Sequence, residues 1–118
     1  MNKILLAFVF LFTTSLFARD AREQQRIDYL IQSLSSLKGA VFIRNTGEYD
    51  ARAAQDHLKK KLNYAGERVK TAEEFIKYCA SESSMTHHPY KIRFADGTEK
   101  ETGAYFREKL KEFDQGKR

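Results

Sequence analysis

Residues 39–50 constrain the fold most, because this stretch carries signals to end a helix, form a strand, turn and begin another helix. Gly39 can take the left-handed conformation that often follows a helix. Residues 41–44 place apolar side chains on both faces of an extended chain, which is typical of a central strand. Asn45 tolerates a positive φ and indicates a turn, and Asp50 predicts the N-cap of the next helix.

Apolar residues at steps of three and four predict four amphipathic helices. The second is expected from Asp50 to Gly66, and the third begins with a capping box in which Thr71 and Glu74 bind backbone N–H groups. The fourth is expected from about Gly103. The four stripes share an inward orientation and comprise Ile27, Leu30, Ile31, Leu34 and Leu37; Ala54, Leu58, Leu62 and Ala65; Ala72, Phe75, Ile76 and Cys79; and Phe106, Leu110 and Phe113.

The pattern of side chains over residues 90–101 predicts two further strands. Residues 90–94 alternate apolar and basic side chains, Asp96 and Gly97 predict a hairpin turn, and residues 98–101 read as a polar edge strand. We therefore predict a single α+β domain, with four helices packed on a small antiparallel sheet of residues 41–44, 90–94 and 98–101.

The first 18 residues predict export. Lys3 precedes an apolar run over residues 4–12, and small residues then lead to Ala18 as a cleavage point. The run is shorter than the roughly 20 residues that span a bilayer, although a retained amphipathic anchor is the alternative. We expect a mature domain of residues 19–118, frayed over residues 114–118, in the periplasm or outside the cell.

Length, charge and cysteine content limit the classes of partner. The 118 residues suit one domain with a core that needs no crosslink, and a net charge of +5 on an interleaved surface is only mildly basic. We expect no nucleic-acid partner for an exported protein of this kind. Cys79 lies on an inward stripe and is interpreted as a small core residue, so a monomer is expected. A disulfide-linked dimer through Cys79 and a reactive thiol are the alternatives.

Signatures of catalysis and metal binding are missing from the sequence. No pair of cysteines or histidines has zinc-site spacing, and no glycine-rich phosphate loop occurs. His87 and His88 are adjacent in a loop, where neighbouring side chains usually diverge. We expect no metal, no cofactor and no catalytic residue. The enzyme alternative is a small hydrolase that uses a serine with His57, although no Gly-x-Ser-x-Gly motif holds such a serine.

Polar side chains near the strand ends favour a binding function instead. Arg44 and Arg93 have guanidinium groups suited to carboxylate or phosphate, and both can project from one face if their strands pair. His57 lies one helical turn from Lys61 at the margin of the core stripe. The candidate binding residues are Arg44, Asn45, Tyr49, His57, Ser84, Tyr90 and Arg93. An anionic envelope component or an envelope protein is the expected partner. The alternative is that both arginines only pair with neighbouring carboxylates and stabilise the fold.

Several stretches spread over the mature chain carry a resemblance: residues 26–31, 39–45, 49, 53–54, 57–58, 68–76, 80–84, 89–90 and 96–97. On these residues the chain resembles a family of small exported bacterial proteins known as a domain of unknown function. The chain departs from that family at residues 86–88, where relatives tend to have a glycine-containing loop. The resemblance implies export and a single domain, and it implies no activity.

Overall fold

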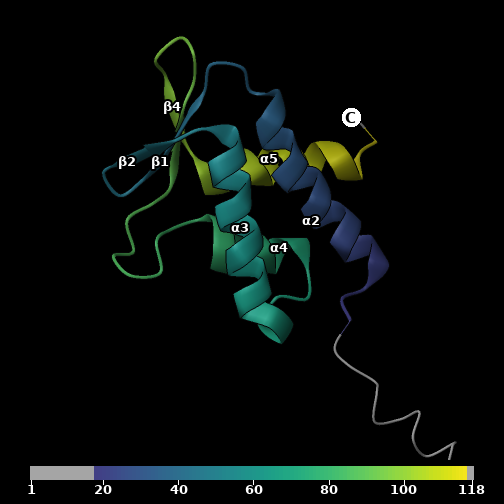
Figure 1. Ribbon diagram of the computed structural model, residues 1–118. Helices are drawn as coiled ribbons and strands as arrows, with labels where there is room; N and C mark the ends of the chain where they lie inside the picture. Colours follow the sequence, from purple (N-terminus) through teal and green to yellow (C-terminus); the bar gives the residue numbers. More distant parts are fainter. Residues whose placement is uncertain (1–17, 117–118) are drawn as a thin grey trace, which may run out of the picture.

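The computed structural model describes residues 18–116. Apart from Ala18, the predicted export segment lies outside the described residues. In chain order the elements are α2 (Ala21–Ser33), a 3₁₀ turn (Leu34–Ser36), β1 (Val41–Arg44), β2 (Gly47–Tyr49), α3 (Ala51–Ala65), a 3₁₀ turn (Gly66–Arg68), α4 (Ala72–Phe75), a π-helical segment (Ile76–Ala80), β3 (Lys91–Arg93), β4 (Glu99–Glu101) and α5 (Thr102–Asp114). Figure 1 shows these elements as four helices beside one small sheet, so the predicted α+β fold is confirmed. No described helix is both long and apolar enough to cross a bilayer.

The sheet has four antiparallel strands in the order β2-β1-β3-β4, and β1 is central as predicted. The strand β2 was missed, because only a turn was expected there. Asn45 has a φ of 58°, and together with Thr46 it forms a two-residue loop that brings Gly47 opposite Arg44. The turn therefore ends earlier than expected, and the three residues after it can pair with β1.

The strand register separates the two predicted arginines. Val41 pairs with Arg93 and Phe42 pairs with Ile92, and directly paired residues share a face of the sheet. Since side chains alternate along a strand, Arg44 lies on the face of Phe42, which packs toward the helices, whereas Arg93 lies on the outer face. The expectation that both arginines project from one face is wrong, although their strands do pair.

The core lies between the helix-facing side of the sheet and the four helices. Ile27, Leu58, Phe75, Ile92 and Phe106 all belong to one buried cluster, and none of them is more than 3% exposed. The Phe75 and Phe106 rings lie 6.0 Å apart between their centroids. The inward stripes predicted from helical spacing are therefore confirmed at Ile27, Leu58, Phe75 and Phe106, and Ile92 is buried on the strand that alternation predicted.

The third helix differs from its prediction in length and type. The capping box forms, because the Thr71 hydroxyl accepts from the Glu74 backbone and the Glu74 carboxylate accepts from the Thr71 backbone. After Phe75 the chain widens into the π-helical segment, and the Ser81 hydroxyl donates to the Ile76 carbonyl at 2.6 Å. Cys79 lies in this segment and is 1% exposed, so it occupies the inward face that its spacing predicted.

Both ends of the described domain are held by specific side-chain contacts. The Asp20 carboxylate accepts a hydrogen bond from the backbone N–H of Arg22 and caps α2. At the other end α5 continues to Asp114, where a frayed tail was expected, because the Asp114 carboxylate binds Arg26 of α2. Gln115 and Gly116 continue as a hydrogen-bonded turn.

Candidate functional site

A cavity of about 330 Å³ opens between the β1–β2 hairpin and α3. Four predicted binding residues line it: Arg44, Tyr49, His57 and Tyr90. Much of the wall is apolar and comes from Phe42, Leu58 and the alanines on the first turn of α3. A cavity of this size with apolar walls and a few polar groups is the usual form of a small-ligand site.

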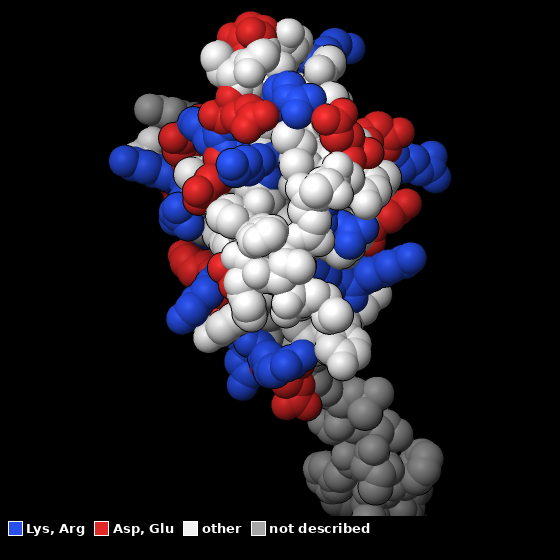
Figure 2. Space-filling model, turned by 90° about the vertical axis from the view of Figure 1, so that its left-hand side faces the viewer, with Lys and Arg blue, Asp and Glu red and all other residues white. Residues whose placement is uncertain are grey.

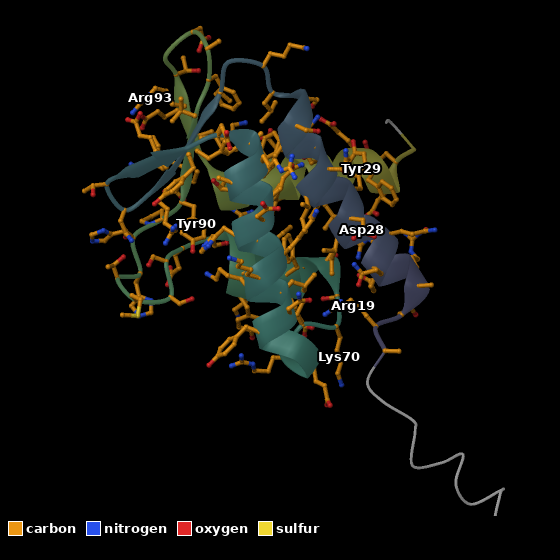
Figure 3. All side chains as sticks on the ribbon, viewed as in Figure 1. Arg19, Asp28, Tyr29, Lys70, Tyr90 and Arg93 are labelled. Atoms are coloured by element: carbon orange, nitrogen blue, oxygen red, sulfur yellow. The ribbon has the colours of Figure 1, made fainter. Side chains whose placement is uncertain are left out.

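Tyr90 is the centre of a polar network at the inner edge of this cavity, beside α3 (Figure 3). The Lys61 ammonium lies 3.0 Å from the Tyr90 hydroxyl oxygen and also donates to the Glu82 carbonyl at 3.1 Å. His57 Nε2 lies 3.1 Å from the same hydroxyl. A lysine ammonium can only donate, so the Tyr90 oxygen accepts from Lys61. The hydroxyl proton of Tyr90 is then free to be donated to His57 Nε2.

This network favours a neutral His57 with its proton on Nδ1. Nε2 can accept from Tyr90 only if it carries no proton. The surroundings favour the same state: burial first, and then the charges of Arg44, Lys61 and Lys60, lower the pKa of His57. The His57 ring also meets the Tyr90 ring edge-on, with 5.7 Å between ring centroids.

Arg44 reaches the cavity and pairs with none of the described carboxylates. Its guanidinium lies over the Tyr49 ring, 5.0 Å from the ring centroid, and donates to the Tyr49 hydroxyl at 3.3 Å. No carboxylate of the described residues lies within 4.0 Å of it. Gly47 makes this arrangement possible, since a Cβ at that position would come within 2.6 Å of the Tyr49 hydroxyl.

Arg93 has the opposite environment. It binds Glu48 at 3.2 Å and Glu99 at 3.3 Å on the outer face of the sheet. In Figure 3 it lies beside β4, away from Tyr90 and α3. Arg93 therefore follows the predicted alternative, in which the arginine pairs with neighbouring carboxylates.

Asn45 and Ser84 lie outside the first cavity. The Asn45 side chain accepts from the Thr86 hydroxyl at 2.6 Å and so joins the β1–β2 turn to the loop of residues 83–90. This loop contains no Lys, Arg, Asp or Glu. Figure 2 looks at the side that carries the hairpin and shows a broad uncharged area bordered by charged side chains.

A second cavity of about 910 Å³ adjoins the first along α3. His57 and Lys60 line both cavities, and Ser84 lines the second. The residues of this cavity that were not predicted include Lys60, Lys61, Tyr64, Arg68 and Tyr78. A signal for two of them exists in the sequence, because His57, Lys61 and Tyr64 recur at steps of four and three and lie on one face of α3.

The cavities do not bring together a metal site or a serine–histidine pair. Among residues 18–116, no group of three His, Cys, Asp or Glu side chains could hold a metal ion. His87 binds Glu82 at 2.7 Å and faces neither cavity. Of the described serines none is hydrogen-bonded to His57, whose Nε2 contacts Tyr90. Burial raises the pKa of the Cys79 thiol, which disfavours the reactive thiolate.

Comparison with known proteins places this architecture in a family. The model of the family described as Family of unknown function (DUF5329) matches residues 21–114. This chain belongs to that family. A relative from Salmonella typhimurium (strain LT2), Uncharacterized protein YfeK, is 38% identical over 92 residues, which cover 76% of this chain and 77% of the relative. No solved structure matches the chain significantly.

The family match coincides with the folded unit. Its limits, residues 21–114, are the first residue of α2 and the last residue of α5, and they enclose both cavities. The resemblance to a family of unknown function is thereby confirmed. The match assigns no activity to the chain.

Proposed function

We propose that this protein is a non-enzymatic binding protein of the bacterial envelope, and that it holds an anionic group of its partner in the cavity between the β1–β2 hairpin and α3. One observation carries the proposal: Arg44 lines this cavity, and no carboxylate of residues 18–116 lies within 4.0 Å of it. Its ring contact with Tyr49 orients the guanidinium and leaves donors for a carboxylate or phosphate.

The electrostatics of the cavity support an anion. Arg44, Lys60 and Lys61 surround His57, and Asp56 is the one carboxylate among the residues that line the cavity. An anion beside His57 would offset the positive charge of these three cations, which disfavours protonation of the His57 ring. The apolar wall suits a partner whose anionic group is attached to a less polar body.

The envelope location rests on the sequence. A basic residue, a short apolar run and small residues over residues 1–18 predict secretion. The expected partner is accordingly an anionic component of the envelope or an envelope protein.

A binding role is favoured over the hydrolase alternative by the position of His57. A general base has to lie within hydrogen-bond reach of its serine, and no described serine is hydrogen-bonded to His57, whose Nε2 contacts the Tyr90 hydroxyl. A structural dimer through Cys79 is disfavoured for a separate reason, since a thiol that is 1% exposed cannot meet a second chain without local opening.

The proposal is tested with galacturonate as the anionic probe and galactose as its neutral match. We expect galacturonate to raise the pKa of His57 in NMR titrations of the full chain, because a nearby negative charge favours the protonated ring. Galactose should leave that pKa unchanged. The response to galacturonate should disappear in Arg44→Gln.

Arg93→Gln is the matched control, because it removes an arginine from the outer face of the same sheet. It should retain the response of wild type. A galacturonate effect that survives Arg44→Gln, or that is lost equally in both variants, would refute the assignment of this cavity.

A further inference from the structure

The two cavities adjoin one another along α3. They share His57 and Lys60, and their lining extends from Ala53 in the first cavity to Ala65 in the second. At the rise of an α-helix, twelve residues correspond to about 18 Å. A site of this length exceeds what a single anionic group requires, so the ligand that fits it is extended.

Tyrosines with adjacent cations recur along this site. Arg44 lies over the Tyr49 ring at 5.0 Å, and Lys61 lies over the Tyr90 ring at 4.9 Å from the centroid. Farther along, Arg68 lies over the Tyr64 ring at 5.9 Å. Such distances are within the range of cation–π attraction, which holds each cation beside an aromatic surface.

Exposed tyrosines and an excess of cations characterise the second cavity. Tyr64 is 86% exposed and Tyr78 is 53% exposed, although large aromatic side chains gain free energy when they are buried. Glu74 is the one carboxylate of this cavity, and it already accepts from the backbone of Lys70 and Thr71 at the start of α4. The cations Lys60, Lys61 and Arg68 therefore dominate the charge.

We propose that the ligand is an acidic polysaccharide that extends across both cavities. This inference rests on the proposed function, because one sugar carboxylate occupies the first cavity beside Arg44. Neighbouring sugar rings pack their C–H faces on Tyr64 and Tyr78, and Arg68 and Lys60 attract further carboxylates. Tyrosine serves this purpose because its ring contacts the sugar face while its hydroxyl stays in water.

An acidic sugar chain is favoured over a nucleic acid by the predicted export of the protein. Single-stranded nucleic acids also stack on aromatic rings in basic grooves, so they are the competing outcome of the experiment.

The experiment measures binding of galacturonate and of its di-, tetra- and hexasaccharides to the full chain by calorimetry. We expect the hexasaccharide to bind at least about tenfold more tightly than the monosaccharide, because the linked sugars engage the second cavity at high effective concentration. Tyr64→Ala combined with Tyr78→Ala should remove this gain and leave monosaccharide binding unchanged. Both side chains are exposed, so the variant is expected to fold.

Met85→Ala is the matched control, since Met85 is 88% exposed and lines neither cavity. It should bind like wild type. A monosaccharide that binds without any gain in the hexasaccharide, or a gain that survives loss of both tyrosines, overturns the inference and leaves the proposed function intact. Absence of binding by monosaccharide and hexasaccharide alike overturns both. A thymidine oligonucleotide of equal charge that binds as tightly as the hexasaccharide also overturns the inference.

Discussion

Arg26 and Asp114 join the first and last helices of the described fold. The Arg26 guanidinium donates two hydrogen bonds to the Asp114 carboxylate, at 3.1 Å from Nε and 2.8 Å from Nη2. Two more reach Glu73 at 3.1 and 2.9 Å, and one reaches Glu23 at 2.8 Å. Glu23 also accepts from the backbone of Ala72 at the start of α4. A single side chain therefore connects α2, α4 and α5.

Replacing this arginine should destabilise the whole fold. We expect Arg26→Met to lower the free energy of unfolding by about 2 kcal/mol, the scale of lost hydrogen bonds to charged groups. The loss stays moderate because the carboxylates of Glu73 and Asp114 are 64% and 35% exposed and can be hydrated. Urea unfolding measures the change. Arg22→Met is the control, since Arg22 is 65% exposed and lies 3.7 Å from Asp114, and it should change stability by less than about 0.5 kcal/mol.

The same cluster should make stability depend on acid pH. Hydrogen bonds from Arg26 lower the pKa of Asp114 and of Glu73 in the folded state. Their contribution is therefore complete above the ordinary carboxyl pKa of about 4 and is lost as pH falls through the lowered values. We expect wild type to lose more stability than Arg26→Met between about pH 5 and pH 2 in urea unfolding. Parallel curves for the two proteins would contradict this role of the cluster.

The Tyr90 network favours one tautomer of His57. We expect ¹⁵N NMR of the imidazole ring to show the proton on Nδ1 in wild type at neutral pH. In Tyr90→Phe the pKa of His57 should rise, because the hydroxyl that donates to the neutral ring is gone. Tyr49→Phe is the control, since the Tyr49 hydroxyl contacts Arg44 and not His57. An unchanged His57 titration in Tyr90→Phe would show that the hydroxyl does not hold the neutral state.

Gly47 should be required for the position of the Tyr49 ring. A Cβ at residue 47 would lie 2.6 Å from the Tyr49 hydroxyl and 2.9 Å from two ring carbons, so Gly47→Ala has to displace the ring from Arg44. We expect galacturonate binding to weaken several-fold, while stability changes by less than about 1 kcal/mol because the ring can rotate toward solvent. Calorimetry and urea unfolding measure the two effects. Thr46→Ala in the same turn should leave binding unchanged, and equal binding by Gly47→Ala would refute the arrangement.

The helices could be predicted because their signals are local. Helical spacing alone placed Ile27, Leu58 and Phe106 in the core, since a buried stripe depends only on residue order and helix geometry. The strand β2 could not be predicted in the same way. Three residues of mixed polarity have no distinctive pattern, and they form a strand because the loop at Asn45 and Thr46 returns them to β1.

The candidate site was predicted in part for a similar reason. Arg44, Tyr49, His57 and Tyr90 meet in one cavity, although they come from four separate places along the chain. Arg93 does not join them. The register of strand pairing decides which face of the sheet a side chain occupies, and the alternation of residues along one strand does not determine that register.

The amino-acid order by itself determined the number of amphipathic helices, their caps at Asp50 and Thr71, and the apolar character of the core, because each depends on neighbours within a few residues. The tertiary structure alone decided that α3 lies against the β1–β2 hairpin and leaves a cavity where Arg44 has no carboxylate partner among the described residues. The physical reason is that packing between distant segments selects which polar groups neutralise one another and which remain available to a ligand.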